Sequence, residues 1–193
     1  MKENSFFKPV IVLSGICFFV TLALALTNFV SAPVIAANTE KAAIENRIAL
    51  LPDADNFTDA TDSIDLASET GKATVTEVYT ADNGAGAVFT VDTSSFGGNM
   101  TMMIGVDADG AITGVKVTDH ADTPGVGTRN FTDEYLALYE GVSELTTSNV
   151  KKDTAITSTG APFSGSFLTG ASVTGTAMHT AVYEALAKFA QLG

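Results

Sequence analysis

The chain has 193 residues, with 10 Lys and Arg against 22 Asp and Glu, and a formal net charge of −12. This excess of negative charge opposes binding to a phosphate backbone, so nucleic acid is not an expected partner. The single cysteine, Cys17, excludes an internal disulfide and a cysteine-ligated metal cluster, and two histidines disfavour a histidine-rich metal site. The sequence therefore predicts no metal site.

An uncharged segment separates Lys8 from Glu40, and residues 10–30 within it are almost wholly apolar. As a helix rising about 1.5 Å per residue, residues 10–30 reach about 31 Å, which matches the hydrocarbon core of a bilayer. We therefore predict a single membrane-spanning helix, with the basic N-terminal flank in the cytoplasm and the acidic remainder outside the membrane. The alternative is a cleaved signal peptide, because small residues follow the apolar run, although the run is longer than an ordinary signal core.

A connector is expected after the apolar segment. Apolar residues at helical spacing over 39–51 predict a juxtamembrane amphipathic helix that Pro52 ends. Residues 53–72 are rich in Asp, Ser and Thr, which predicts a loop or an excursion at the rim of the following domain. No chemistry is assigned to this connector.

The remaining residues alternate between apolar and polar in four segments, which predict four strands over 74–80, 86–92, 101–107 and 112–119. Short turn signals between these segments indicate a mostly antiparallel meander. Apolar residues at helical spacing predict one helix over 131–139, with Phe131, Tyr135, Leu138 and Tyr139 on one face. A second apolar stripe near the C-terminus contains Met178, Val182, Ala185, Leu186 and Phe189.

These elements predict an α+β fold in which a mostly antiparallel sheet packs against helices, preceded by a transmembrane helix. The predicted organisation is a cytoplasmic N-terminus and anchor over 1–38, a juxtamembrane helix and acidic connector over 39–72, and one domain over 73–193.

One segment with chemical potential directly follows the fourth predicted strand and reads His120-Ala121-Asp122-Thr123-Pro124-Gly125-Val126-Gly127. Proline fixes one backbone angle, and the two glycines allow a ligand to approach the backbone closely. Such a turn can present amide groups to a flat polar ligand. By composition alone it is a tight loop, and composition favours a plain connection from a strand to a helix.

The second segment, residues 164–176 (SGSFLTGASVTGT), is rich in hydroxyl groups and glycine and opens the last predicted helix. Hydroxyls at a helix start cap its free amides, and the same amides, with the positive end of the helix dipole, hold a phosphate. The sequence contains neither a Walker phosphate loop nor a G-x-S-x-G nucleophile elbow. No histidine is placed by sequence beside a candidate serine, so a hydrolase triad has no support.

Taken in order, these segments resemble the FMN-binding RnfG family of Rnf-type ion-translocating electron-transport complexes. The resemblance covers nearly the whole chain and rests on Leu26-Thr27-Asn28, Leu51-Pro52-Asp53-Ala54, Phe96-Gly97-Gly98, the loop from His120 to Gly127, and Thr169-Gly170-Ala171-Ser172. The family loop reads H-x-E-T-P-G-L-G, so Asp122 and Val126 are conservative departures. Ser166 replaces an acidic residue that the family often has three positions before Thr169.

The resemblance implies FMN attached through a phosphoester to Ser172, the position that matches the last residue of the family motif S or T-G-A-T, with Thr174 as the alternative hydroxyl. It implies further cofactor contacts around the attachment and in the loop, from Thr169, Gly170, Ala171, Val173, Thr174, His120, Thr123, Pro124, Gly125, Val126 and Gly127. We expect the Thr123 hydroxyl and the amides of Gly125 and Val126 to act as donors to the flavin. His120 is expected either to hydrogen-bond the ring or to satisfy a carbonyl at the strand end.

The implied function is electron relay through covalent FMN in a membrane complex that couples ferredoxin:NAD electron transfer to translocation of Na⁺ or H⁺. The implied partners are the other membrane subunits and a flavin transferase for maturation, and no complete active site is expected in this chain alone. The nearest alternative is the equivalent NqrC subunit of a Na⁺-translocating NADH:quinone reductase. From a different class, the chain could be a membrane-tethered binding module without a cofactor.

Overall fold

The structure is a computed structural model, and it describes residues 4–145, 168 and 170–192. The chain divides after Ile44 into two compact units, of which the second begins at Glu45. Of the range 39–72, predicted as a juxtamembrane helix and connector, residues 45–72 fall in the second unit.

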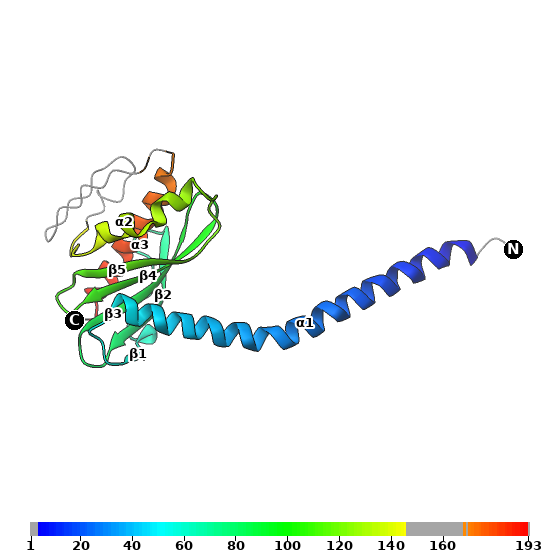
Figure 1. Cartoon of the computed structure of the whole chain (residues 1–193), viewed down its shortest axis with the longest axis horizontal. Helices are drawn as coiled ribbons and strands as arrows, with labels where there is room; N and C mark the ends of the chain where they lie inside the picture. Colours follow the sequence, from blue (N-terminus) through cyan, green and yellow to red (C-terminus); the bar gives the residue numbers. More distant parts are fainter. Residues whose placement is uncertain (1–3, 146–167, 169, 193) are drawn as a thin grey trace. The chain divides into compact units, whose positions relative to one another are not determined.

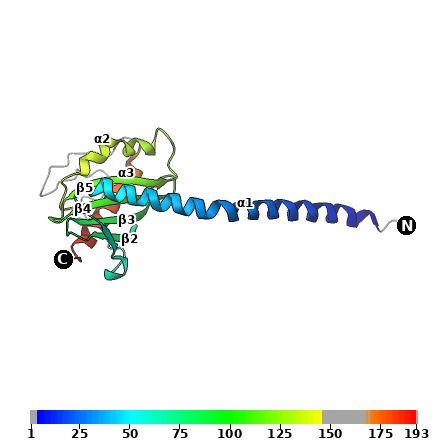
Figure 2. The same cartoon turned by 60° about the horizontal axis from the view of Figure 1, so that its bottom comes forward.

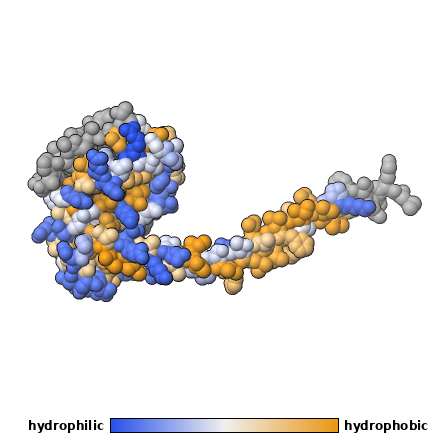
Figure 3. Space-filling model, in the orientation of Figure 1, coloured by the Kyte–Doolittle hydropathy of each residue, from blue (hydrophilic) through white to orange (hydrophobic). Residues whose placement is uncertain are grey.

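Helix α1 extends from Asn4 to Leu50 and includes Pro9 and Pro33. The helix predicted over 39–51 is present as the last part of α1, which ends at Leu50, just before Pro52. It is continuous with the apolar segment, because a proline such as Pro33 removes one backbone donor but does not always end a helix. Residues Phe7–Leu50 include a stretch long and apolar enough to cross a membrane. Figure 3 shows apolar side chains over much of the surface of this helix.

Five strands form one antiparallel sheet in the order β1-β2-β3-β4-β5 (Figures 1 and 2). The strands are β1 (Phe57–Asp59), β2 (Ala73–Ala81), β3 (Gly86–Ser94), β4 (Asn99–Asp107) and β5 (Ile112–His120), and a short 3₁₀ turn, η1 (Thr61–Ser63), follows β1. The four predicted strands and their antiparallel meander are confirmed. Strand β1 was not predicted, and it pairs with the end of β2 at the edge of the sheet.

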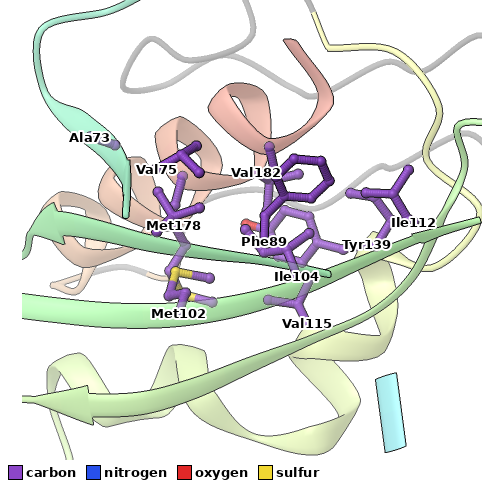
Figure 4. Close-up of a cluster of buried hydrophobic side chains, with 14 of the residues drawn as sticks. Ala73, Val75, Phe89, Met102, Ile104, Ile112, Val115, Tyr139, Met178 and Val182 are labelled. Atoms are coloured by element: carbon purple, nitrogen blue, oxygen red, sulfur yellow. The ribbon is translucent and has the colours of Figure 1, made fainter. Parts of the chain in front are cut away.

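Helix α3 (Ser172–Phe189) covers one face of the sheet and buries most of the predicted apolar stripe. Figure 4 shows Met178 and Val182 of this helix facing Val75, Phe89 and Met102 of the strands. The alternation of the strands explains this packing, because residues two apart point to the same face. The start of α3 is therefore held against the sheet by a continuous apolar core.

The last turn of α1 packs on the opposite face of the sheet, where Leu50 and Leu51 contact Val88 and Met103. Gly105 makes this approach possible, because a Cβ atom there would lie 2.6 Å from the Leu50 carbonyl oxygen. The Thr113 hydroxyl also donates a hydrogen bond to that carbonyl.

A second contact fixes the same turn through Arg47. Its guanidinium lies 3.4 Å from the centre of the Tyr79 ring, and its Nη2 lies 3.9 Å from Glu77 Oε2. Cation–π contacts of this kind are worth about 0.5–2 kcal/mol. The helix end and the sheet are thus joined by apolar, hydrogen-bonded and cation–π contacts.

The single helix predicted over 131–139 was wrong in detail. The segment forms η2 (Gly127–Phe131), α2 (Asp133–Leu136) and η3 (Ala137–Tyr139), because Thr132 adopts an extended backbone that separates the first two. Tyr135 and Tyr139 are buried as predicted, whereas Leu138 is 43% exposed. Within α2 and η3, the two tyrosines therefore lie in the core and Leu138 does not.

Candidate cofactor site

The loop that follows β5 is exposed along most of its predicted ligand-binding part. Thr123, Pro124, Gly125 and Val126 are all exposed, and Gly125 has a φ of +79°, a conformation that favours glycine. The Gly125 N–H donates to the Thr128 hydroxyl over 2.8 Å, and the Val126 N–H donates to the Thr123 carbonyl over 3.2 Å. Both amides predicted as flavin donors are therefore used inside the loop, which leaves the Thr123 hydroxyl as the remaining predicted donor.

His120 ends strand β5 and is exposed. Its ring lies 4.9 Å from the ring of Phe131, measured between centroids, with a tilt of 47°. Phe131 closes η2, so this contact holds the loop's two ends together. The histidine packs beside the loop that the resemblance assigned to the cofactor.

Asp122 connects three separate segments of the site. Its Oδ1 accepts a hydrogen bond from the Gly97 N–H over 2.7 Å, and its Oδ2 accepts one from the Thr174 hydroxyl over 3.0 Å. Asp122 is 5% exposed and Thr174 is 1% exposed. Hydrogen bonds to a charged acceptor in such a setting are stronger than neutral ones. One carboxylate thus joins the loop after β5, the turn between β3 and β4, and the first turn of α3.

Two further residues complete this junction. Gly127 lies against the Asp122 side chain, and a Cβ atom there would come within 2.6 Å of its carboxyl carbon. The Asn130 Nδ2 donates to the carbonyls of Gly127 and Ala171 over 3.2 and 3.1 Å. Its Oδ1 is buried and meets no donor within the part of the chain that the structure describes. The loop and the helix start are therefore locked in one arrangement.

Helix α3 begins at Ser172, and its N-cap residue, Ala171, offers no side-chain hydrogen bond. Gly170 precedes it with a φ of +85°, and Val173 is 46% exposed. The first amides of a helix have no partner within the helix, so an uncapped start leaves donors for an anionic group. Ser172 is only partly buried, unlike Thr174, so the two candidate hydroxyls differ in access.

The structure places most of the predicted site residues around this junction. Thr169 lies outside the described residues, as does Ser166. Sequence reasoning left Asp122 and Asn130 out of the predicted site residues, since their role depends on contacts between distant segments. Sequence reasoning also missed a cavity of about 520 Å³ alongside α3. Residues of the connector form part of the lining of this cavity.

A buried histidine lies two turns into α3. His179 is 1% exposed and its Nδ1 is hydrogen-bonded to the Tyr139 hydroxyl. Burial lowers the pKa of His179 to about 3, and burial raises the pKa of Tyr139 well above its ordinary value. Both side chains are therefore neutral at physiological pH, and they belong to the core beneath the site.

Residues 95–187 match the family described as the FMN-binding domain. This range contains the turn before β4, the loop after β5 and nearly all of α3. The match therefore includes all three segments that Asp122 joins.

The chain is also similar to curated proteins over most of its length. It is 32% identical to the G subunit of the Na⁺-translocating ferredoxin:NAD⁺ oxidoreductase complex of Acetobacterium woodii, covering 94% of this chain and 93% of that protein. It is 23% identical to the G subunit of the proton-translocating ferredoxin:NAD⁺ oxidoreductase complex of Clostridium ljungdahlii, covering 89% and 88%. A third relative is the G subunit of the ion-translocating oxidoreductase complex of Shewanella amazonensis, 30% identical over 65% of this chain and 61% of that protein.

Proposed function

Because the chain belongs to the family of G subunits of ion-translocating ferredoxin:NAD⁺ oxidoreductase complexes, we propose that it relays electrons through an FMN covalently attached to Ser172. The observation that carries the attachment site is the contrast between two hydroxyls on the first turn of α3. Ser172 is partly exposed at an uncapped helix start, whereas the Thr174 hydroxyl is buried and donates to Asp122.

The residues at the start of α3 fit a phosphoester. A phosphodiester keeps one negative charge, and the free amides and positive dipole end of α3 stabilise such a charge. The charged side chains of the protein are mostly acidic, so this stabilisation has to come from the backbone. The FMN, when bound, supplies the ring that gains and loses electrons.

The remaining residues of the junction hold the attachment residue in place. Asp122 ties Thr174 to the turn before β4, and Asn130 ties Ala171 to the loop after β5. A covalent tether also prevents loss of the cofactor from an extracytoplasmic domain, whatever its binding affinity. The chain's own contribution is thus to attach, orient and retain the electron carrier.

The anchor and the partners follow from the same proposal. Helix α1 holds the protein in the membrane through residues 10–30, with the N-terminus in the cytoplasm and the domain outside, as the basic N-terminal flank favours. The other membrane subunits of the complex exchange electrons with it, and a flavin transferase attaches the FMN. The complex couples ferredoxin:NAD electron transfer to Na⁺ or H⁺ translocation, in keeping with the names of its relatives.

Mass spectrometry of the full chain, purified from membranes that contain an active flavin transferase, tests the attachment. The tryptic peptide from Asp153 to Lys188 contains both hydroxyls, and we expect it to carry the mass of FMN less water. The modification should disappear in Ser172→Ala and persist in Thr174→Val. Retention in Ser172→Ala with loss in Thr174→Val would move the attachment to Thr174. An unmodified wild-type peptide would favour a binding module without cofactor.

A further inference from the structure

The cavity of about 520 Å³ lies along one face of α3, directly after the proposed attachment residue. Its lining from the helix consists of Val173, Thr176, Ala177 and Thr180. Thr176, Ala177 and Thr180 follow Val173 by three, four and seven residues. This spacing places all four side chains on one face of the helix. The cavity thus begins one residue past Ser172 and follows the helix for two turns.

The opposite wall comes from the connector, through Gly71 and Lys72, and from the end of β3, through Thr93 and Ser94. The Thr93 hydroxyl donates to the Lys72 carbonyl over 3.3 Å. Within the described residues, the Lys72 ammonium makes neither a hydrogen bond nor an ion pair. Lys72 is exposed, and it is the one charged residue among those that line this cavity.

The two hydroxyl groups on the helix wall of the cavity already donate hydrogen bonds to backbone carbonyls of α3. The Thr176 hydroxyl donates to the Ser172 carbonyl and the Thr180 hydroxyl to the Thr176 carbonyl, each over 2.8 Å. Together with Val173 and Ala177, these residues offer an occupant mainly apolar contact. The cavity thus has a mainly apolar helix wall, and its opposite wall includes the exposed residue Lys72.

The wall that carries Lys72 is fixed by Glu184 of α3, which is fully buried. Its carboxylate accepts hydrogen bonds from the backbone N–H groups of Glu69 and Thr70 at 3.0 and 2.7 Å and from the hydroxyls of Ser68 and Thr70 at 2.9 and 2.6 Å. One turn later, Lys188 pairs with Glu69 over 2.9 Å. The connector is therefore anchored to the same helix that bears Ser172.

We propose that this cavity receives the isoalloxazine ring of the FMN attached to Ser172, and that Lys72 raises the reduction potential of the ring. The inference rests on the proposed function, since it needs the phosphoester at Ser172. A volume of about 520 Å³ falls within the range of small-molecule sites, and the apolar helix face suits a flat aromatic ring. Electrons added to the ring increase its negative charge, which a nearby cation stabilises more than it stabilises the oxidised ring.

The first test measures the midpoint potential of the flavin in full-length protein whose modification at Ser172 has been verified by mass. Lys72→Gln should give a more negative potential than wild type, and Lys72→Arg should restore the wild-type value. The matched control is Lys116→Gln, which removes an exposed lysine of β5 that does not line the cavity and should leave the potential unchanged.

The second test asks whether the ring occupies the cavity, by quenching flavin fluorescence with iodide. Ala177→Leu fills the cavity and should make the flavin more accessible to iodide, whereas Ala190→Leu, just beyond the end of α3, should not. The inference is overturned if Lys72→Gln matches its control in potential, or if folded Ala177→Leu matches its control in quenching, while Ser172 remains modified. An unmodified Ser172 would instead overturn the proposed function, and this inference with it.

Discussion

The Asp122 carboxylate accepts a hydrogen bond from the Thr174 hydroxyl, although the two residues lie 52 positions apart in the chain. The second oxygen of the same carboxylate accepts from the Gly97 N–H, 25 positions away in the other direction. The hydroxyl of Thr174 is buried and already donates, whereas Ser172 on the same turn is only partly buried. The bond therefore organises the start of α3, and it distinguishes the environments of the two hydroxyls.

Replacing Asp122 with alanine should destabilise the protein by about 2–3 kcal/mol, because the buried Thr174 hydroxyl and the Gly97 N–H lose their charged acceptor. Urea unfolding of the full chain in detergent measures this difference. Asp119→Ala is the matched control, since Asp119 is exposed near the end of β5. Equal stability of the two variants would show that the carboxylate does not join these segments.

Gly125→Ala and Gly127→Ala should differ in stability although both change a glycine of the same loop. Gly125 has open space around its missing Cβ and a φ of +79°, so alanine adds only the left-handed backbone strain, about 1 kcal/mol. At Gly127 the new Cβ would lie 2.6–2.8 Å from atoms of the Asp122 side chain, which predicts a loss of about 2–3 kcal/mol. Unfolding midpoints in urea compare the pair, and the reverse order would contradict the described packing.

The regular part of the fold could be read from the sequence because its signals are local. Alternation over segments of seven or eight residues predicted β2 to β5, and the stripe from Met178 to Phe189 predicted α3. Strand β1 has three residues, too few for periodicity, and it exists through its pairing with β2. The helix predicted over 131–139 is interrupted at Thr132, which has an extended backbone. The spacing of apolar residues does not reveal such an interruption.

The candidate site was less predictable because its contacts join distant residues. Motif order located the loop after β5 and the start of α3, but no local pattern indicates that Asp122 faces Thr174. The cavity is still harder to infer, because one wall comes from α3 and the other includes Lys72 of the connector. The sequence predicted only that this connector is acidic and polar. Glu184 and Thr70 form a hydrogen bond although more than 100 residues separate them in the chain. No periodicity in the sequence indicates that two such polar residues are partners.

Glu184→Gln should destabilise the protein by about 2–3 kcal/mol, although the two side chains have nearly the same shape. The buried carboxylate accepts four hydrogen bonds. The glutamine side chain has an NH₂ group in place of one carboxylate oxygen, so at least one of the four donors would face another donor and lose its acceptor. Chemical denaturation measures the loss, with Glu134→Gln as the control because Glu134 is exposed on α2. A Glu184 variant as stable as its control would mean that the connector is not fixed through this residue.

His179 predicts a pH dependence of stability between about pH 7 and pH 3. Its pKa is about 3 in the folded protein because the ring is buried, against an ordinary value of 6.5. Well above pH 6.5 the ring is neutral in both states, and protonation of His179 costs no stability. As the pH falls below 6.5, the unfolded chain binds a proton that the folded chain does not, so stability decreases until the folded pKa is reached. Between pH 7 and pH 5 the loss is about 2 kcal/mol.

Urea unfolding of the full chain at pH 7 and pH 5 measures this loss, and two variants assign it. His179→Gln should remove most of the difference between the two pH values, even if it lowers stability at both, whereas His120→Gln should preserve it because His120 is exposed. The carboxylates of Asp59 and Asp82 do not interfere, since hydrogen bonds from neighbouring hydroxyls lower their pKa values and their contribution is lost only below about pH 4. A His179→Gln protein that keeps the full pH dependence would place the proton uptake elsewhere in the chain.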